Sequence, residues 1–209
     1  GIAKMYNVSM DEAAQIKGLE IPMHDPRAFF GQALAYVTSP RGADHNRPDW
    51  YTIQLSLGVP ELGILEPKYR FSMSNRMDDF TKFQDIRQVY ESLLMCNFTQ
   101  STLTQVMNML NAITSWNYTI EDILKVGERI TNIKRAINNR MGIMRKDDRI
   151  PKIVIQPLSE GATTGKAPNI EDMLKNYYEK RKWDWETGKP TKEKLEELSL
   201  KDVAESIYN

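Results

Sequence analysis

The sequence predicts an all-α fold: an irregular helical domain with long loops. Apolar side chains recur every three or four residues over most of the chain, and this spacing places them on one face of a helix. Prolines and glycines interrupt residues 46–75 and 151–168 too often for regular structure there. With 209 residues, of which 41% are hydrophobic and 27% charged, the chain is long enough to bury a core.

The first predicted helix separates the two histidines of the sequence. Asp25 followed by Pro26 is typical of a helix start, and Pro40 ends the apolar periodicity that follows. We therefore expect His24 and His45 to lie near opposite ends of one short helix.

Beyond this helix the pattern predicts a long loop and then two amphipathic helices. Residues 46–75 are expected to be an irregular loop, in which residues 51–55 form either a short strand or a turn of helix. A helix over about residues 76–96 has acidic side chains in its first turn, which suits the helix dipole. Ser101 is expected to cap the next helix, which Trp116 closes.

The clearest helix begins at Thr119 and ends just before Gly142. Thr119 is a good capping residue, and acidic side chains follow it in the first turn. Gly127 lies inside this helix, where glycine costs about 1 kcal/mol relative to alanine. We therefore expect another backbone to approach the helix closely at Gly127.

The carboxyl-terminal part differs in composition from the rest. Residues 151–168 are predicted to be an extended arm lying across a helical surface. A helix is expected after Asn169, to about Lys182, and a last short helix after Thr191. We expect the chain to divide into three parts. Residues 1–20 are a linker or the end of a preceding helical domain, and residues 21–150 are a helical domain. Residues 151–209 are an arm with helices that pack on that domain.

Four aromatic side chains near the end of the predicted Asn169 helix allow two interpretations. Tyr177, Tyr178, Trp183 and Trp185 resemble a platform on which nucleic-acid bases stack. Aromatic residues at the end of a helix more often anchor it to a core, and we favour that interpretation.

Charge and hydropathy exclude several classes of partner. The chain has 28 basic and 28 acidic residues, so no net charge attracts nucleic acid or an anionic membrane. No apolar run approaches the roughly 20 residues that span a bilayer, and no signal-peptide pattern is present. We expect a cytoplasmic protein. Because the chain begins at Gly1, we also expect it to be a piece of something longer.

Site chemistry alone predicts no complete catalytic constellation. Cys96, the single cysteine, is a buried apolar thiol, a reactive thiol or one metal ligand, and burial is the favoured interpretation on chemistry alone. His24 beside Asp25, and Asp44 beside His45, are each either a general acid–base pair or the source of a helix-terminal hydrogen bond.

Several segments resemble, in the same order, the carboxyl-terminal part of the tungsten-dependent aldehyde:ferredoxin oxidoreductases. They are residues 18–27 with 35–45, 91–96, 126–130, 145–151 and 177–195. The resemblance covers nearly the whole chain. It implies the helical carboxyl-terminal domain of that family, with residues 21–150 contacting the cofactors.

The resemblance also implies cofactors and roles for individual residues. The family holds a tungsten ion between two pterins of the molybdopterin type, beside a four-iron, four-sulfur (4Fe–4S) cluster. Cys96 matches the fourth ligand of that cluster, a role that suits a soft thiolate and replaces the preference for burial. Glu91 matches an acidic pterin-binding residue, with Leu94 and Met95 in the same motif. His45 matches a histidine near the metal that assists proton transfer.

Three residues depart from the family pattern. Leu94 stands where the motif has glycine, which lets backbone approach a cofactor closely. Asp44 replaces a common cysteine, and Asn97 replaces a frequent lysine. The amino-terminal domain and three upstream cysteines of the family are outside this chain. We therefore expect residues elsewhere to complete both cofactor sites, and this chain alone to be inactive.

The implied function is oxidation of an aldehyde to a carboxylic acid, with electrons passing through the cluster to ferredoxin. One alternative is a relative that reduces an aromatic or acyl-thioester substrate with a dedicated iron–sulfur subunit. Another is a non-catalytic helical subunit or remnant. The implied partners are the remaining domains of the enzyme, ferredoxin or an iron–sulfur subunit, and an aldehyde, with a homodimer as an option.

Overall fold

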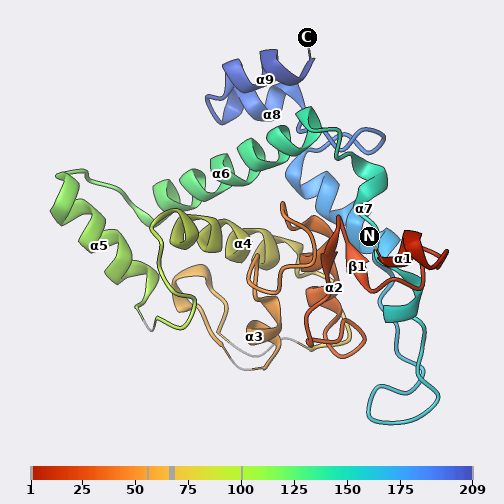
Figure 1. The fold of residues 1–209 in the computed structure, drawn as a ribbon. Coiled ribbons are helices and arrows are strands. Elements are labelled where there is room, and N and C mark those ends of the chain that lie inside the picture. The colour runs from red at the N-terminus through yellow and green to blue at the C-terminus, as the bar shows by residue number, and fades with distance from the viewer. Residues whose placement is uncertain (1, 56, 66–68, 100, 209) are drawn as a thin grey trace.

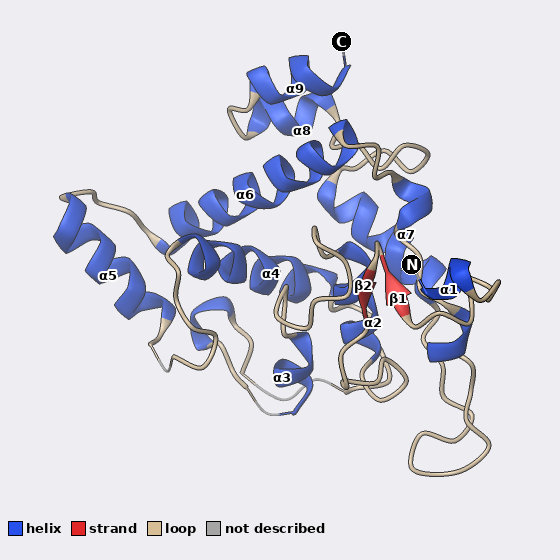
Figure 2. Ribbon diagram, viewed as in Figure 1, coloured by secondary structure: helices blue, strands red, loops and turns tan. Residues whose placement is uncertain are grey.

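The computed structural model describes residues 2–55, 57–65, 69–99 and 101–208, and over these residues it confirms the predicted all-α class (Figure 1). The only sheet in this part of the chain is a two-stranded antiparallel hairpin (Figure 2). The α-helices are α1 (Ile2–Met5), α2 (Phe30–Thr38), α3 (Trp50–Leu55), α4 (Met77–Ser92), α5 (Leu103–Thr114), α6 (Ile120–Arg140), α7 (Ile170–Arg181), α8 (Lys192–Glu197) and α9 (Lys201–Tyr208). The strands are β1 (Gln15–Ile16) and β2 (Leu19–Glu20), and short 3-10 helices cover Pro60–Leu62, Arg145–Asp147 and Lys152–Val154.

The two long helices α4 and α6 pack against each other at the centre of the fold (Figure 1). Helix α7 packs against α4, whereas α5 and α9 pack against α6. The largest apolar cluster joins α2, α3, α4 and α7 around fully buried aromatic side chains: Tyr36, Trp50, Phe80 and Tyr177. Two smaller clusters fill the space between α4, α5 and α6 and between α6, α8 and α9.

The contact between α4 and α6 requires a glycine. A Cβ atom at Gly127 would lie 2.2 Å from the backbone oxygen of Asp85 in α4. A side chain at this position would therefore force the two helices apart. The predicted close approach of another backbone at Gly127 is confirmed.

The structure confirms the predicted helix starts in the second half of the chain. The side chains of Thr119, Asn169 and Thr191 each accept a hydrogen bond from a backbone N–H in the first turn of α6, α7 and α8, respectively. Gly142 follows the end of α6 with a φ of 85°, as a residue just past a helix end often requires.

Two predicted helix starts are wrong. The cap of α5 is Thr102 and not Ser101, because Thr102 and Gln105 form a reciprocal capping box. The helix predicted to start at Asp25 and Pro26 begins only at Phe30. The Asp25 carboxylate instead accepts hydrogen bonds from Arg27, from both its backbone N–H (2.8 Å) and its Nε (3.0 Å). This local turn uses the oxygens that would have capped a helix.

The predicted loop over residues 46–75 and the predicted extended arm over residues 151–168 both contain short helices. Residues 51–55 belong to α3, so the turn of helix is correct and the strand is wrong. Residues 56 and 66–68 of the predicted loop 46–75 lie outside the described residues. Residues 151–168 contain one short 3-10 helix and then a mostly exposed loop, which a bridge between Leu158 and Thr164 closes.

The amino-terminal hairpin, which sequence patterning did not predict, supports the segment that leads to His45. Lys17 and Gly18 form its turn, and both have a positive φ, as two-residue hairpin turns often require. A Cβ atom at Gly42, after α2, would lie 2.4 Å from the backbone oxygen of Ile16. Because the hairpin and this segment approach so closely, the hairpin helps to position the loop beyond Gly42.

A buried carboxylate joins the hairpin to the helical core. Asp148 contacts Nζ of Lys17 at 2.6 Å and Nη1 of Arg135 at 2.7 Å, and it accepts a hydrogen bond from the Tyr178 hydroxyl. Its side chain is fully buried. Burial alone would raise the pKa of Asp148, but the charges of Lys17 and Arg135 and the hydrogen bonds to it outweigh burial and lower that pKa.

The aromatic side chains near the end of α7 are core anchors. Tyr177, Tyr178 and Trp183 are buried, and their rings meet edge to face or tilted. The guanidinium of Arg135 lies over the Trp183 ring at 4.8 Å. The favoured interpretation is confirmed, since rings packed in this way are not available for stacking against bases. None of the helices in the described part of the chain combines the length and the apolar character needed to cross a lipid bilayer.

Replacing Asp148 tests its role as the buried link between hairpin and core. We expect Asp148→Asn to lower the free energy of unfolding by about 3–5 kcal/mol, because Lys17 and Arg135 would keep buried charges without a counter-charge. The difference in free energy of unfolding between wild type and variant should shrink as the pH falls through the folded-state pKa of Asp148. That pKa is lowered, and the carboxylate stabilises the wild type only while it is ionised.

Denaturant titration at several pH values measures both effects. Asp202→Asn is the matched control, because Asp202 is exposed in the first turn of α9 and its loss should cost only a few tenths of a kcal/mol. An Asp148→Asn protein as stable as the control would contradict the assignment.

Candidate functional site

The loop that carries His45 takes its shape from the neighbouring Asp44. The buried Asp44 carboxylate accepts a hydrogen bond from the backbone N–H of Asn46 at 2.9 Å and pairs with Nε of Arg47 at 2.8 Å. These contacts close a turn around His45. The imidazole of His45 is half-buried, so it remains partly accessible while its backbone is held.

Arg47 connects this loop to the end of α4. Its guanidinium contacts the carboxylate of Glu91, which also pairs with Nζ of Lys134 in α6 at 2.6 Å. A row of alternating charges therefore runs from the His45 loop across α4 to α6. Arg47 thus attaches the loop that bears His45 to Glu91, and the family resemblance assigned these two residues to one site.

A second ion pair fixes the far side of the same loop to α4. The guanidinium of Arg87 donates two hydrogen bonds to the Asp49 carboxylate, at 2.6 and 2.7 Å, and both side chains are buried. Paired hydrogen bonds of this kind restrain both distance and orientation. The loop between α2 and α3 is thus attached to α4 at two points, Arg47 and Asp49.

Helix α4 ends in a left-handed residue. The backbone N–H of Leu94 donates to Glu91 O at 3.0 Å, and that of Met95 donates to Tyr90 O at 2.9 Å, which together form a Schellman motif. Leu94 has a φ of 56°, a conformation that favours glycine. The glycine expected at this position therefore has a conformational reason, and Leu94 adopts the same backbone at a cost in strain.

The residues after this turn alternate between core and surface. Leu94 is 93% exposed, and Met95 packs against the cluster between α4, α5 and α6. Cys96 is exposed and not in a disulfide. Burial, the interpretation favoured on chemistry alone, is wrong for Cys96.

An exposed thiol fits the role of a single ligand to an iron–sulfur cluster. A soft thiolate is the ligand such clusters use, and an accessible position lets ligands from elsewhere meet it. Within the described residues, no three His, Cys, Asp or Glu side chains lie together as a metal site. The donor set of this part of the chain thus fits one cluster ligand and no self-contained metal centre.

The two histidines lie together in the structure, contrary to the prediction that a helix separates them. Because α2 starts late, the segment before it folds back, and the rings of His24 and His45 are 5.0 Å apart. The ring of Tyr51 in α3 stacks on His24 at 4.2 Å. All three side chains are half-buried. They form a group of polar rings next to the row of charges described above.

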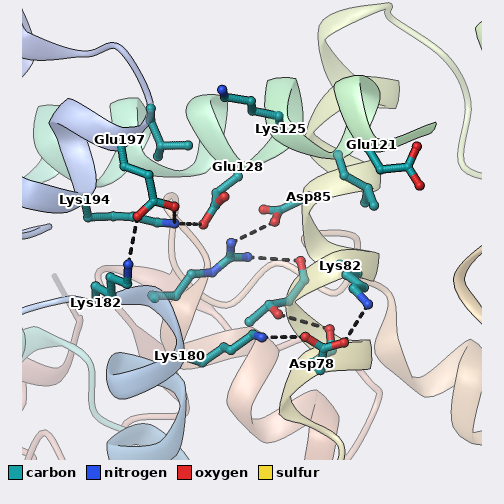
Figure 3. Close-up of a pocket in the computed structure, with 14 residues that line it drawn as sticks. Asp78, Lys82, Asp85, Glu121, Lys125, Glu128, Lys180, Lys182, Lys194 and Glu197 are labelled. Atoms are coloured by element: carbon teal, nitrogen blue, oxygen red, sulfur yellow. Dashed lines mark hydrogen bonds and ion pairs between the residues drawn. The ribbon is translucent and has the colours of Figure 1, made fainter. Parts of the chain in front are cut away.

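A hollow of about 530 Å³ lies elsewhere in the fold, between α4, α6, α7 and α8 (Figure 3). Its charged side chains pair with one another: Asp78 with Lys82 and Lys180, Asp85 with Arg181, Glu128 with Lys194, and Glu197 with Lys182 and Lys194. Because these pairs neutralise most of the charge in the groove, we interpret it as a structural network that holds the four helices together.

Sequence reasoning missed the residues that assemble the site. The contacts of Arg47 and Lys134 with Glu91 have no local signal, because Glu91 is distant from both in the sequence. The sequence suggests Asp44 either as a departure from the family pattern or as a partner of His45. In the structure its carboxylate instead contacts Arg47 and the backbone N–H of Asn46 in its own turn. Tyr51 lay in a stretch predicted as loop. The one available signal was the placement of Arg47 two residues after His45, next to a run of turn-forming residues.

Comparison with known proteins places residues 1–200 in one family. They match the family model described as "Aldehyde ferredoxin oxidoreductase, domains 2 & 3". A "Tungsten-containing aldehyde ferredoxin oxidoreductase" of Pyrococcus furiosus is 37% identical over 88% of this chain and 30% of its own length. The protein of that name in Thermococcus kodakarensis is 34% identical over 95% of this chain and 32% of its own length.

A more distant relative has a different name. An "Aliphatic sulfonate oxidoreductase, WOR-like subunit" of Pyrococcus furiosus is 28% identical over 93% of this chain and 29% of its own length. The chain thus spans about a third of the length of the curated relatives it matches.

The strained end of α4 yields a stability prediction. Leu94→Gly should raise the free energy of unfolding by about 0.5–1 kcal/mol, because glycine relieves left-handed strain of about 1–2 kcal/mol but makes the unfolded chain more flexible. Leu93→Gly is the matched control: Leu93 has a φ of −85°, and glycine there should be destabilising. Denaturant titration of both variants measures the difference. Equal destabilisation by the two substitutions would contradict the assigned motif.

Proposed function

This chain belongs to the aldehyde ferredoxin oxidoreductase family, and from this we propose that it forms the carboxyl-terminal part of a tungsten-pterin enzyme. The proposed reaction is oxidation of an aldehyde to a carboxylic acid, in which water supplies the added oxygen atom. Electrons would leave through an iron–sulfur cluster to ferredoxin. The rest of the enzyme would supply the remaining ligands of both cofactors.

The observation that carries this proposal is the bridge from the His45 loop to the end of α4. The two segments assigned to proton transfer and to cofactor binding are far apart in sequence, yet Arg47 contacts both Asp44 and Glu91. Side chains with these roles have to meet around one substrate. Their attachment to each other supports a shared site.

His45 is the residue that we assign to proton transfer. Conversion of an aldehyde and water to an acid releases two protons and two electrons. Imidazole is the side chain that ordinarily changes charge near neutral pH, so it can accept a proton and then release it to solvent. The structure supports this assignment in one respect, because Asp44 holds the loop of His45 while its ring is half-buried.

The end of α4 is the part that we assign to the cofactors. Cys96 would be a cluster ligand, and the turn formed by Glu91, Leu94 and Met95 would contact a pterin. The Glu91 carboxylate is already oriented by Arg47 and Lys134, which lowers the entropic cost of ordering it for a ligand. When bound, the tungsten-pterin group and the cluster supply the electron acceptors that no protein side chain provides.

The names of the relatives favour aldehyde chemistry over the alternatives. The relatives named for aldehyde oxidation are 34% and 37% identical to this chain, compared with 28% for the one named for sulfonates. Purification of the intact enzyme would reveal its assembly. It would show whether a dedicated iron–sulfur subunit takes the place of ferredoxin and whether the enzyme is a homodimer.

The role of Cys96 is testable by electron paramagnetic resonance of the full-length enzyme. Cys96→Ala should remove or alter the signal of the reduced iron–sulfur cluster and lower the iron content, because a thiolate ligand is lost. Asn97→Ala is the matched control, since it changes the neighbouring half-buried residue and keeps the thiol. A wild-type cluster signal in the Cys96→Ala enzyme would refute the ligand assignment.

A further inference from the structure

The contact between His24 and His45 places a second imidazole beside the residue assigned to proton transfer. The two ring centroids are 5.0 Å apart and their planes are tilted by 43°. At this separation the two rings affect each other's protonation, because a charge on one disfavours a charge on the other. Simultaneous protonation of both rings is therefore disfavoured.

The position of His24 is held by aromatic and backbone contacts. Its ring is nearly parallel to that of Tyr51, at 16° and 4.2 Å between centroids, and Phe29 meets Tyr51 edge to face. The hydroxyl of the buried Tyr36 donates a hydrogen bond to the backbone oxygen of His24 at 2.9 Å. A residue held on both its ring and its backbone keeps a constant geometry toward His45.

The carboxylates nearest to His24 along the packed segments lie in its own segment and in the loop between α2 and α3. These three carboxylates are each paired with a guanidinium: Asp25 with Arg27, Asp44 with Arg47, and Asp49 with Arg87. Arg41 of the same loop also lies near the Asp44 carboxylate, at 3.5 Å. The remaining titratable groups are His45, Tyr36 in α2 and Tyr51 in α3. Partial burial, and then the proximity of His45, lower the pKa of His24.

These contacts give His24 a role distinct from that of His45. We propose that His24 is a positioning residue that takes up, from His45, a proton released in the reaction and passes it to solvent. The proposal rests on the proposed function. An O–H bond of water breaks as its oxygen joins the aldehyde carbon, and that proton moves to His45, then to His24, then to bulk water. The aldehyde C–H bond breaks in the same oxidation, and its proton also ends in bulk water. The electron pair leaves through the redox groups already named.

Tyr51 has a supporting part in this arrangement. Its ring covers one face of His24, which leaves the edge of the imidazole as the route for the proton. Burial and the neighbouring Asp49 raise the pKa of Tyr51, so its hydroxyl stays protonated and does not compete for the proton. Tyr51 therefore keeps its proton, and imidazole is the kind of side chain in this cluster that can exchange one near neutral pH.

Chemical modification of the full-length enzyme measures the coupling without any activity assay. Diethyl pyrocarbonate reacts with neutral imidazole, so its rate at each histidine, resolved by peptide mass spectrometry across a pH series, reports each titration midpoint. We expect the midpoint of His24 to lie below 6.5 in the wild type and to move upward in His45→Asn. An unchanged His24 midpoint in His45→Asn would overturn the proposal.

Turnover of the holoenzyme measures the consequence for the reaction. His24→Gln should lower kcat with an aldehyde and an artificial electron acceptor by about tenfold or more, with little change in KM and an altered pH profile. Added imidazole should restore part of the rate. Met23→Gln changes the exposed neighbouring side chain and should behave like the wild type. His24→Gln with a wild-type rate and pH profile would overturn the proposal.

The two experiments separate this proposal from the one it rests on. An enzyme that oxidises no aldehyde but shows coupled modification of the histidines contradicts the proposed function and supports the coupled pair. An enzyme that oxidises aldehydes but shows no coupling contradicts the role of His24 and leaves the proposed function standing.

Discussion

The ion pairs of Arg47 are the interaction on which the candidate site depends. One guanidinium contacts Asp44 in the His45 loop and Glu91 at the end of α4, and Lys134 adds a contact from α6. Isolated ion pairs on a protein surface contribute little. This one is different, because the Asp44 side chain is only 10% exposed and the charges form a continuous row. Without Arg47, the His45 loop would lose its contact with Glu91 at the end of α4.

Close backbone contacts elsewhere in the fold position the two segments that Arg47 joins. Gly127 lets α6 approach α4 closely enough for Lys134 to reach Glu91, and Gly42 lets the hairpin support the start of the loop. The Schellman turn then directs Leu94 outward and Met95 inward, so the following Cys96 lies at the surface. Backbone constraints at a few positions thus determine where the reactive side chains lie.

Local signals predicted the helices well and the site poorly. Thr119, Asn169 and Thr191 cap their helices through hydrogen bonds to residues three positions away, so the sequence pattern contains both partners. Asp25 is a typical capping residue that binds Arg27 instead, and a local pattern cannot decide between two local partners. The hairpin, the paired histidines and the Arg47 bridge depend on contacts between distant segments. The resemblance to a family identified His45 and Glu91, but not the residue that joins them.

The most direct test of the account is metal analysis of the natively purified protein together with every polypeptide that accompanies it. The account predicts that the same preparation contains iron and either tungsten or its chemical analogue molybdenum. This prediction rests on the family to which the chain belongs, on the exposed thiol of Cys96 and on the loop that holds His45. A preparation that includes the upstream part of the enzyme but contains neither of the two metals and no iron would contradict the account.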